Sequence, residues 1–408
     1  MFFVNTIQLS RTYKARQTGD RMFVFDPYDP IVDSNPFPLY KELRDNYPCY
    51  WSEAGKVWML SRYADVVTAA SDWQTYSSLK GNLLAELPSR TGATLGTTDP
   101  PRHDRLRALV QHAFTRRNLS GLDEQLREIA KSAVKSFEGR KQFDFNREFS
   151  TAMTMKTLSL IIGLPPTDEH HLRRQAMLCV QTDPVIKGKT EEHELAFKWI
   201  NEFAKSIIEE RRARPQDDLI SQFSVAEIDG DRLDEREVIM TTTMLIVAGA
   251  ESLGAFISLM AMNLADHPEA LERCVQSPEL LPDAIEESLR FNTSAQRFKR
   301  TLTRDVELHG QLMKAGDAVC LTYGSANRDE RQFPDPDRYD LARKPRGHLG
   351  FGNGVHACLG SMMARQVLRI AFEEFHKVFP RYRRAETELP WMPSTNFRSP
   401  MRLELIFD

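Results

Sequence analysis

The chain has 408 residues, and its 54 Lys and Arg residues against 57 Asp and Glu residues give a net charge of −3. That balance gives no reason to expect a nucleic-acid-binding protein, which normally carries a basic excess, and a hydrophobic fraction of 41% excludes a disordered or fibrous chain. The five cysteines are scattered without a CxxC pair, which argues against a disulfide framework or a structural zinc site and indicates free thiols in a reducing compartment.

The first third of the chain alternates between short elements and turns. Residues 1–24 are expected to be irregular, because they lack the basic start and the sustained apolar run of a signal peptide. We predict a short helix near 39–44, a strand at 57–60, and a loop of small and turn-forming residues from 77 to 101. Apolar residues then recur at helical spacing over 122–137, which predicts an amphipathic helix.

Helices continue to about residue 290, and the pattern then changes to short strands and turns. A helix is expected again at 360–378 and a strand at 401–407. Helices dominate, and no shift in composition marks a boundary. We therefore predict one large domain over residues 1–408, mainly α with small β-sheets, in the α+β class.

The longest apolar segment, residues 238–265, contains one ionisable side chain, Glu251. Its length would allow it to span a bilayer, but a carboxylate in mid-membrane is costly. We therefore predict a long helix that is buried through the centre of a soluble protein. Asp234 and Glu237 form a capping pair at its start, and Pro268 ends it.

The segment around Cys358 is the most informative part of the chain. Its glycines allow tight turns and the close approach of a flat ligand. Cys358 lies between this glycine-rich loop and the start of a helix, whose N-terminus stabilises the thiolate that binds metals. A single thiolate with an open opposite face suits haem iron. The alternatives are a buried structural cysteine and a dinucleotide loop, which lacks its third glycine because Ala357 stands there.

The sequence F-G-N-G-V-H-A-C-L-G over residues 351–360 resembles the haem-binding signature F-G-x-G-x-H-x-C-x-G of the cytochrome P-450 family, and every fixed position is met. The resemblance implies haem b as the cofactor, with Cys358 as the axial ligand of the iron. It also implies that His356 contacts a haem propionate and that Phe351 packs beside the thiolate. The other cofactor-binding positions of this segment are Gly352 and Gly360.

Glu287 and Arg290 are spaced i, i+3 on a helix, a pattern that by itself usually indicates a surface ion pair. Their place about seventy residues before Cys358 resembles the family's ExxR helix. The segment Pro336-Asp337-Arg338-Tyr339 resembles the family's P-x-R-aromatic pattern, which implies that Arg338 is the third member of the group. The implied role of all three residues is to support the cysteine loop.

His103 and Arg107 share one helical face by their i, i+4 spacing, which without context indicates a solvated surface. The surrounding residues resemble the family's helix that binds haem propionates, so the resemblance assigns both side chains to that role. Arg300 matches another propionate-binding arginine, with Lys299 as the neighbour that could be confused with it. A guanidinium suits a carboxylate because it donates two parallel hydrogen bonds.

The buried helix carries Ala248-Gly249-Ala250-Glu251-Ser252, which resembles the family's A-G-x-[DE]-T segment across the distal face of the haem. The alternative is a lone buried polar pair that the backbone satisfies. The resemblance places Ala248 and Gly249 against the cofactor, with Gly249 allowing haem and dioxygen to come close. It also makes Glu251 and Ser252 the catalytic pair that relays protons. Ser252 replaces the usual threonine, which keeps the hydroxyl but loses the methyl group and has a freer rotamer.

The resemblance implies a soluble bacterial monooxygenase in the cytoplasm, with no nucleic-acid or membrane partner. It would insert one oxygen atom from O2 into a C–H bond of a small, mostly hydrophobic substrate. No flavin or iron–sulfur motif is visible, so electrons are expected from an external ferredoxin with its NAD(P)H reductase. We expect that donor to dock on the cysteine side, near Arg116, Arg117, Arg346 and Arg365.

Substrate contacts are expected from the 77–101 loop and from family position elsewhere. Those positions are Val247, Ala248, Ser294, Ala295, Gln296, Thr395, Asn396 and Phe397. For Arg297 the alternative is recognition of a carboxylate, but an outward-pointing arginine is the commoner arrangement and is the one we expect.

Two other functions stay open from the sequence. Ser252 allows a peroxide-using or non-oxygenating haem-thiolate enzyme, although the retained acid–alcohol pair argues against it. A protein that binds haem or a gas without catalysis is the alternative of a different class, and it would be expected to carry an additional sensor or output domain. Turnover driven by peroxide or by ferredoxin separates the first alternative from a monooxygenase, and substrate-dependent NADH consumption with a ferredoxin couple separates the second.

Overall fold

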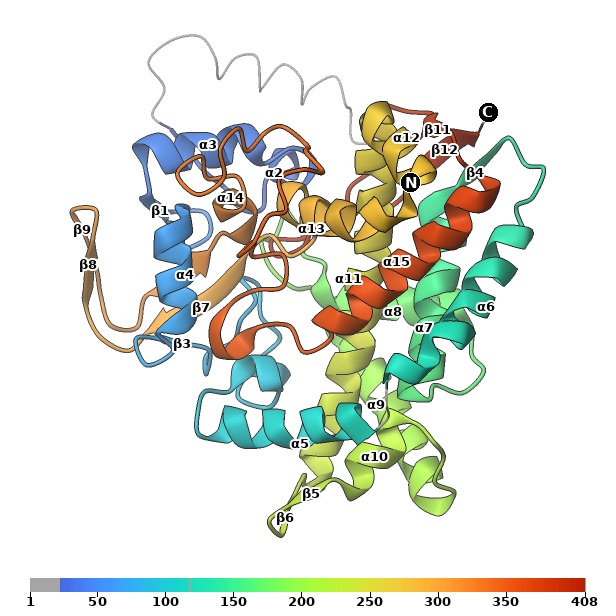
Figure 1. The fold of residues 1–408 in the computed structure, drawn as a ribbon. Coiled ribbons are helices and arrows are strands. Elements are labelled where there is room, and N and C mark those ends of the chain that lie inside the picture. Colours follow the sequence, from blue (N-terminus) through green and yellow to red (C-terminus); the bar gives the residue numbers. More distant parts are fainter. Residues whose placement is uncertain (1–22, 117–118, 408) are drawn as a thin grey trace.

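Helices make up most of the molecule in a computed structural model that describes residues 23–116 and 119–407 (Figure 1). The irregular segment predicted for 1–24 therefore lies almost entirely outside the described residues. The longer helices are α3 (Phe37–Asn46), α4 (Tyr63–Ser71), α5 (Arg102–Arg116), α6 (Asp123–Lys135), α7 (Thr151–Ile162), α8 (Glu169–Val180), α9 (Glu191–Ala213), α10 (Leu219–Val225), α11 (Glu235–Asp266), α12 (Pro268–Gln276), α13 (Leu281–Phe291) and α15 (Ser361–Val378). The shorter ones are α2 (Pro30–Ser34) and α14 (Tyr323–Ala326), with single turns at η1 (Pro88–Arg90), η2 (Leu95–Thr97), η3 (Leu119–Leu122), η4 (Phe145–Ser150), η5 (Pro278–Leu280) and η6 (Gly354–His356).

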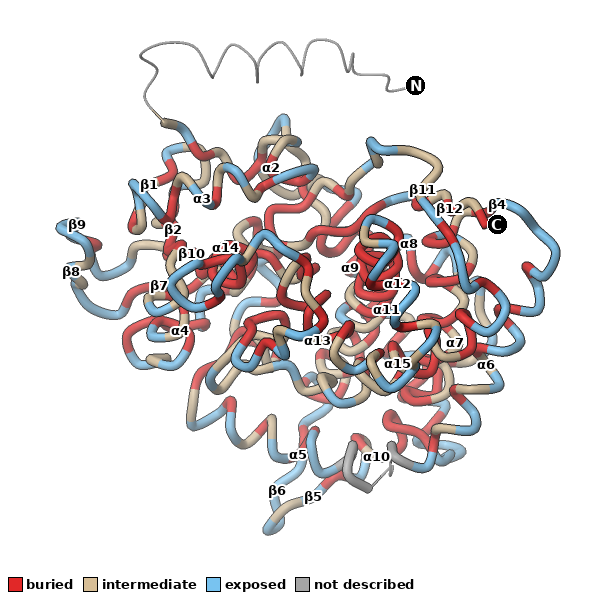
Figure 2. Tube along the Cα trace, turned by 45° about the horizontal axis from the view of Figure 1, so that its top comes forward, coloured by how far each residue is buried: buried red, intermediate tan, exposed pale blue. Residues whose placement is uncertain are grey.

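Helix α11 runs through the middle of the molecule (Figures 1 and 2). Its 32 residues give it a length of about 48 Å. The predicted capping pair is present, because Asp234 accepts from the Glu237 N–H at 2.7 Å and Glu237 accepts from the Asp234 N–H at 3.0 Å. Length and composition would let α11 cross a membrane, but 72% of its most apolar window is buried inside the protein. It packs against α7, α8, α9 and α13, as expected for a core helix.

The largest sheet has the strand order β1–β2–β10–β7–β3 and lies to one side of α11 (Figure 1). Its strands are β1 (Cys49–Ser52), β2 (Val57–Leu60), β10 (Ala318–Leu321), β7 (Phe298–Leu302) and β3 (Tyr76–Ser77). The pairing of β2 with β10 is parallel, with Trp58 opposite Val319, and the other pairings are antiparallel. This sheet carries Arg300 toward the candidate site.

Three smaller sheets complete the fold. The first joins β11 (Tyr382–Arg384), β12 (Glu404–Phe407) and β4 (Gln142–Asp144). The other two are the pairs β5 (Glu227–Ile228) with β6 (Asp231–Arg232), and β8 (Val306–Leu308) with β9 (Gln311–Met313). The mainly helical architecture with small sheets confirms the predicted fold class.

An aromatic cluster fixes α15, the helix that follows the Cys358 loop. The rings of Phe145 and Phe149 in η4 lie 5.0 Å apart, and Phe375 of α15 lies 5.0 Å from each. All three side chains are fully buried. Burying a phenylalanine contributes roughly 1.5–3 kcal/mol, so this cluster anchors α15 firmly against the core.

Candidate active site

The loop that carries Cys358 depends on two glycines. Gly352 and Gly354 have φ values of +72° and +68°, a left-handed conformation that favours glycine. A Cβ atom on Gly354 would lie 2.3 Å from the carbonyl oxygen of Ala70 in α4, so this glycine also lets two backbones meet. The Cys358 N–H donates to the Phe351 carbonyl at 2.8 Å, which closes the loop just before α15 begins.

The thiol of Cys358 is exposed toward a cavity, whereas the other four cysteines are buried. Protein surrounds the sulfur on its remaining sides, and this burial raises the pKa of Cys358. The Gly360 N–H, Arg107 and Arg365 lower that pKa, but burial outweighs them. A coordinating metal cation would favour the thiolate by adding positive charge at the sulfur.

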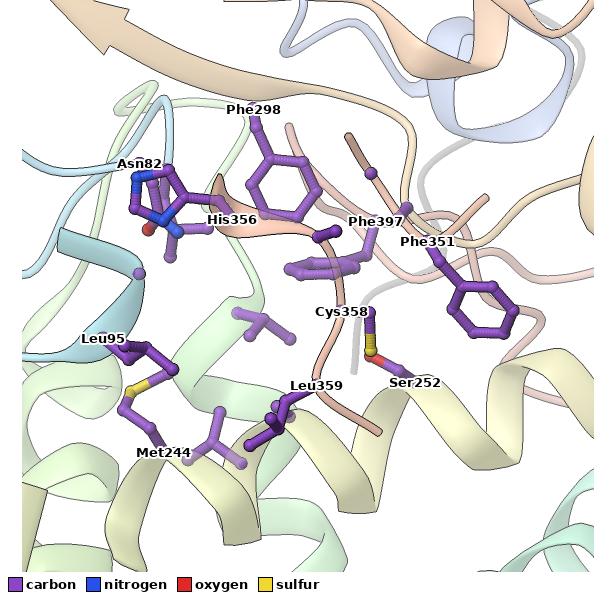
Figure 3. Close-up of a pocket in the computed structure, with 18 of the residues that line it drawn as sticks. Asn82, Leu95, Met244, Ser252, Phe298, Phe351, His356, Cys358, Leu359 and Phe397 are labelled. Carbon is purple, nitrogen blue, oxygen red and sulfur yellow. The ribbon is translucent and has the colours of Figure 1, made fainter. Parts of the chain in front are cut away.

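The cavity lies between the Cys358 loop and α11, and it measures about 1200 Å³ with its mouth included (Figure 3). From α11, the side chains of Met244, Ala248, Ser252 and Phe256 line it, at the i, i+4 spacing of one helical face. Apolar side chains from other elements form much of the remaining wall: Leu83, Leu95, Val180, Phe197, Ala295, Phe298, Leu359 and Phe397.

Five basic side chains line the same cavity: His103 and Arg107 from α5, Arg300 from β7, His356 from the cysteine loop, and Arg90 from η1. The sequence resemblance assigns the first four to the haem propionates. The rings of His103 and His356 lie 4.6 Å apart in a T-shaped arrangement. Arg107 donates to the carbonyl oxygens of Val355 and Ala357 at 3.2 and 2.9 Å, which ties α5 to the cysteine loop. Lys299, the neighbour of Arg300, does not belong to this wall.

His103 and His356 each have a different carboxylate nearby: His103 Nδ1 lies 3.0 Å from Asp104 Oδ1, and His356 lies near Asp99. The Nε2 atom of His356 lies 3.0 Å from the Ser78 hydroxyl and 3.9 Å from Asp99 Oδ1. Burial lowers the pKa of His356 to about 4, and the positive charges of Arg300 and His103 add to that effect. The Nε2 atom of His103 is buried and has no hydrogen-bond partner among the described residues.

This donor set fits the group that the sequence resemblance implies. A buried polar atom without a partner is costly, so His103 Nε2 indicates a ligand that accepts a hydrogen bond in this cavity. Converging arginine and histidine side chains suit carboxylates, and the exposed sulfur of Cys358 suits a metal ion. Haem offers both, with propionates for the four basic residues and iron for the thiolate.

Glu251 and Ser252 lie on different faces of α11. Ser252 lines the cavity, whereas Glu251 is 2% exposed and lies behind the helix. The two touch, because the Ser252 hydroxyl donates to Glu251 Oε2 at 3.4 Å. Burial raises the pKa of Glu251 to about 7, and the positive charge of Arg173 opposes that shift.

Gly249 does not face the cavity, so the prediction that it lets haem and dioxygen come close is wrong. A Cβ atom there would lie 2.5 Å from Leu158 Cδ2, so the glycine allows α11 to pack against α7. Successive helical residues are turned by about 100°, which is why Ala248 and Ser252 share the cavity face and Gly249 does not. Gly360 is also not a wall residue, and it is instead the N-cap of α15.

The ion pair of Glu287 and Arg290 is fully buried, with both side chains at 0% exposure. It is bidentate, with Arg290 NH2 and Nε lying 2.7 and 2.8 Å from the Glu287 carboxylate oxygens. Arg290 also donates to the Asn327 carbonyl at 3.0 Å, and the Asn327 side chain accepts from the Leu349 N–H at 2.6 Å. The pair is thereby connected to the start of the cysteine loop.

The prediction that Arg338 is the third member of this group is wrong. Its side chain is 71% exposed, and its guanidinium lies 3.9 Å from Asp340. Arg343 takes that place, with Nε 3.2 Å from Glu287 Oε1. Neighbouring residues in an extended segment face opposite sides, and here Tyr339 turns inward so that Arg338 turns outward.

Half of the expected substrate residues line the cavity and half stand behind its wall. Those that line it are Val247, Ala248, Ala295 and Phe397. Those that do not are Ser294, Gln296, Thr395 and Asn396, and all four are buried. Asn396 braces the wall by accepting from the Leu84 N–H at 3.2 Å. Alternation accounts for the split over residues 294–296, where Ala295 lines the cavity and its two neighbours do not, whereas Thr395 and Asn396 lie in a bend before Phe397.

Arg297 does not point outward, contrary to the expectation from its residue type. It is 1% exposed, and its NH2 donates to the Ser394 carbonyl at 3.2 Å. Burial raises the pKa of the neighbouring Asp33 to about 7, and the positive charge of Arg297 opposes that shift. Arg297 therefore belongs to a buried polar cluster outside the cavity wall.

Several wall residues were not singled out from the sequence. The 77–101 loop was expected to face substrate, but the side chains that do so are Asn82, Leu83, Arg90 and Leu95. Cys179 and Val180 at the end of α8, Phe197 of α9, Met244 of α11, Phe298 of β7 and Tyr323 of α14 also contribute. No local spacing marks these residues, because long-range packing brings them together. The two turns η1 and η2 inside the loop were the available signal for its ordered shape.

On the opposite side of the Cys358 loop lies a more open hollow lined by Lys344, Arg346, Arg365 and Cys358. Arg365 is engaged within the protein, because its Nε and NH2 lie 2.5 and 2.9 Å from the Glu286 carboxylate. Arg346 is exposed, and Lys344 is 71% exposed. Two of the expected docking arginines thus share this hollow, while Arg117 and the side chain of Arg116 lie outside the described residues.

Comparison with known proteins now adds independent information. A family model described as Cytochrome P-450 matches residues 275–380, which include α13 and the Cys358 loop. The chain is 34% identical over 354 residues to YjiB, named as a cytochrome P-450 of Bacillus subtilis (strain 168), covering 85% of this chain and 88% of the relative. It is 33% identical over 395 residues to the mycinamicin IV hydroxylase/epoxidase of Micromonospora griseorubida, covering 93% and 98%.

The fold comparison agrees with the sequence comparison. The solved structure of cytochrome P-450 CYP109Q5 from Chondromyces apiculatus matches with a TM-score of 0.84 and 31% identity, covering 94% of this chain and 98% of that one. Full-length similarity above 30% identity, together with the placement of Cys358 and its basic neighbours, identifies the family. The chain belongs to the cytochrome P-450 family of haem-thiolate monooxygenases.

Proposed function

We propose that this protein binds haem b and inserts one oxygen atom from O2 into a C–H bond of a small, mostly apolar substrate. The observation that carries the proposal is the cavity itself. It places the Cys358 sulfur on one side, Ser252 of α11 on the other, and the four basic side chains assigned to the propionates at its edge. When bound, the haem would supply the activation of dioxygen and the transfer of the oxygen atom.

The residues would hold the cofactor by complementary charge. Cys358 would be the axial ligand of the iron, and His103, Arg107, Arg300 and His356 would donate hydrogen bonds to the propionates. His356 has a pKa lowered to about 4 by burial, so it would act as a neutral donor unless a propionate raises that value. The hydrogen bonds from the Arg107 side chain to carbonyl oxygens of the cysteine loop would keep the axial ligand and the propionate-binding residues in fixed relative positions.

Proton delivery would pass through Ser252. Its hydroxyl lines the cavity and donates to Glu251 Oε2, so it can hand a proton inward and receive one from the carboxyl group. Burial raises the pKa of Glu251 to about 7, which suits a group that must both hold and release a proton near neutral pH. The apolar walls would exclude bulk water and leave this pair as the proton source.

Electrons would enter on the side of the hollow that holds Lys344 and Arg346. A small acidic ferredoxin, reduced by its NAD(P)H-dependent reductase in the cytoplasm, would complement these exposed cations. Met362, 82% exposed in the first turn of α15, would offer such a partner an apolar contact on the helix that follows the Cys358 loop. Cys358 lines the floor of the same hollow, so the electron path would be short.

The optical spectrum of the dithionite-reduced protein under carbon monoxide tests the central assignment. We expect the red-shifted Soret band of a thiolate-ligated haem. The Cys358→His variant should show the band of histidine ligation instead. A wild-type protein with the histidine-type band, or without haem, would contradict the proposal. Comparing turnover driven by ferredoxin and NADPH with turnover driven by peroxide then separates the monooxygenase from a peroxide-using enzyme.

A further inference from the structure

One wall of the cavity carries positive charge that the cofactor assignment does not use. Arg90, in the turn η1, lines the cavity and is 4% exposed. Asn82 lines it beside Arg90 and accepts from Arg90 NH2 at 3.3 Å. Lys189 lies just behind the wall, because its Nζ donates to the carbonyl oxygen of Cys179, another wall residue, at 2.9 Å. The backbone N–H of Lys299 donates to the Asn82 carbonyl at 2.8 Å, and the Lys299 ammonium interacts electrostatically with Arg90 and Glu86, so Lys299 is the third cation of this group.

A single carboxylate, Glu86, faces these cations within the described part of the chain, and it is already heavily engaged. Its two oxygens accept from the backbone N–H groups of Asn82, Leu83 and Leu87 at 2.9, 3.2 and 3.0 Å. Arg90 NH1 donates to the same carboxylate at 2.5 Å. Glu86 therefore holds the loop and orients Arg90, while the positive charge around it exceeds its own.

The two lysines of this group both have lowered pKa values. Burial lowers the pKa of Lys189 to about 8, and the positive charge of Arg90 lowers it further. Burial also lowers the pKa of Lys299, with Arg90 again acting in that direction against Glu86. The propionate group comes from other elements, because His103 and Arg107 lie in α5 and Arg300 in β7, whereas Arg90 lies in η1.

We infer that the cavity takes a substrate that is apolar along most of its length and ends in a carboxylate, which Arg90 binds with help from Asn82. The inference rests on the proposed function and specifies the substrate class of the same site. Glu86 and Asn82 already orient the Arg90 guanidinium, so little entropy is lost when one of its remaining N–H groups donates to an incoming acid. The apolar wall residues, among them Val180, would contact the rest of the molecule.

The test compares matched acids and amides as ligands of the haem-loaded protein at pH 7.5. The probes are n-alkanoic acids and 4-alkylbenzoic acids, each against its primary amide, and binding is measured from the haem absorption band and by calorimetry. In at least one pair the acid should bind about tenfold more tightly than the amide, since a charge-assisted hydrogen bond is typically worth that much. If no acid exceeds its amide, the inference is overturned.

Two variants separate recognition from a merely structural role of the Arg90–Glu86 pair. Arg90→Gln should remove the preference for the acid and change the dissociation constant of the amide by less than about threefold. Glu86→Gln should keep the preference for the acid over the amide, because glutamine retains an oxygen that can orient Arg90 while it removes the competing negative charge. If both variants instead weaken the binding of acid and amide alike, the Arg90–Glu86 ion pair only stabilises the loop and the inference fails.

Lys80→Gln is the matched control, because it removes one positive charge from the same loop at an exposed position. It should leave both dissociation constants unchanged, whereas an equal loss in Lys80→Gln would point to overall charge and contradict a specific site. The carbon monoxide spectrum is recorded for every sample. A thiolate band with equal acid and amide binding overturns the substrate class alone, while the absence of that band overturns the proposed function.

Discussion

Ser252 and Glu251 contact each other from two faces of the same helix, and the proposed proton relay depends on that contact. The hydroxyl reaches the cavity, and the carboxyl group stays in a buried polar environment whose nearest positive charge is Arg173. Arg173 is itself fixed, because its NH1 donates to Asn146 Oδ1 at 3.2 Å and to the Thr151 hydroxyl at 2.5 Å. The pair thus connects the cavity to a polar network behind α11 that solvent does not enter.

Ser252→Ala should separate oxygen consumption from product formation. Without the hydroxyl, Glu251 has no group in the cavity through which to pass a proton, and we expect product per NADPH consumed to fall about tenfold or more. Ser252→Thr keeps the hydroxyl and should retain most of the coupling. Parallel measurement of NADPH oxidation, peroxide release and product checks this, and unchanged coupling in Ser252→Ala would rule out the relay.

Glu251→Gln should change the pH dependence of stability. Because burial raises the pKa of Glu251 from 4.5 to about 7, the folded protein keeps a proton that the unfolded chain releases. The folded wild type therefore loses stability as pH rises between these two values. From about pH 5 to about pH 7.5, the variant should gain about 2 kcal/mol relative to wild type in free energy of unfolding.

Urea unfolding of both proteins at the two pH values measures this difference. Asp33, whose pKa burial also raises to about 7, titrates in both proteins and cancels in the comparison. A difference between wild type and variant that stays constant with pH would mean that Glu251 ionises with its ordinary pKa in the folded protein.

The sequence predicted the positions of some site residues correctly and of others only in part. Cys358 and His356 were predictable because the motif fixes a loop whose glycines have positive φ. Glu251 and Gly249 were placed on the correct helix, but which side each faces depends on the neighbours of α11 rather than on the motif. Arg338 and Arg343 lie in one irregular segment without periodicity, so nothing in the sequence showed which guanidinium turns inward.

At the scale of elements, α13 and the chain that follows α14 form one support for the cysteine loop. The Glu287 carboxylate accepts from Arg290, from the Asp340 N–H at 2.9 Å and from Arg343. Arg343 adds bonds to the carbonyl oxygens of Asp335 and Arg338 at 2.9 and 3.2 Å. These hydrogen bonds hold α13 to an irregular segment that has no regular backbone hydrogen-bond pattern of its own.

Arg343→Ala should destabilise the protein, and Arg338→Ala should not. Removing Arg343 leaves part of a buried carboxylate and several carbonyl oxygens without their donor, which we expect to cost about 1–3 kcal/mol. Arg338 is exposed, and its loss should stay within about 0.5 kcal/mol. Urea unfolding and haem retention are measured for both variants. Equal losses of stability would mean that Arg338 supports the buried ion pair as much as Arg343 does.

Elements with strong local signals matched their predicted positions best. The predicted helix at 360–378 is α15 (Ser361–Val378), the strand at 57–60 is β2, and the helix at 122–137 is α6 (Asp123–Lys135) with the turn η3 before it. The strand expected at 401–407 begins only at Glu404, where pairing with β4 and β11 starts. Pairing partners decide strand length, and local pattern does not contain them.

For the whole molecule, charge is nearly balanced but unevenly placed. The net charge of −3 would not attract an acidic partner by itself. Lys344 and Arg346, however, are exposed around the hollow whose floor includes Cys358. A local patch of this kind guides a partner at close range, within about 10 Å at moderate salt, even when the distant field is weak.

Reversing these two charges should slow electron transfer. In the double variant Lys344→Glu/Arg346→Glu, reduction by a ferredoxin should be about tenfold slower at low salt and lose most of its salt dependence. The control Lys198→Glu/Lys205→Glu reverses two exposed charges on α9 and should leave the rate within about twofold. Stopped-flow reduction over a range of ionic strengths checks this, and equal slowing in both variants would contradict docking at the hollow.

The parallel pairing of β2 with β10 has a consequence for how the protein is made. Trp58 leaves the ribosome roughly 260 residues before its partner Val319, a delay on the order of ten to fifty seconds at ordinary elongation rates. During that time β1 and β2 expose a strand edge and apolar side chains such as Met59 and Leu60 that the finished fold buries completely. The nascent chain therefore depends on chaperone protection until its last third is synthesised, and slower growth at low temperature is expected to raise the yield of soluble protein from a foreign host.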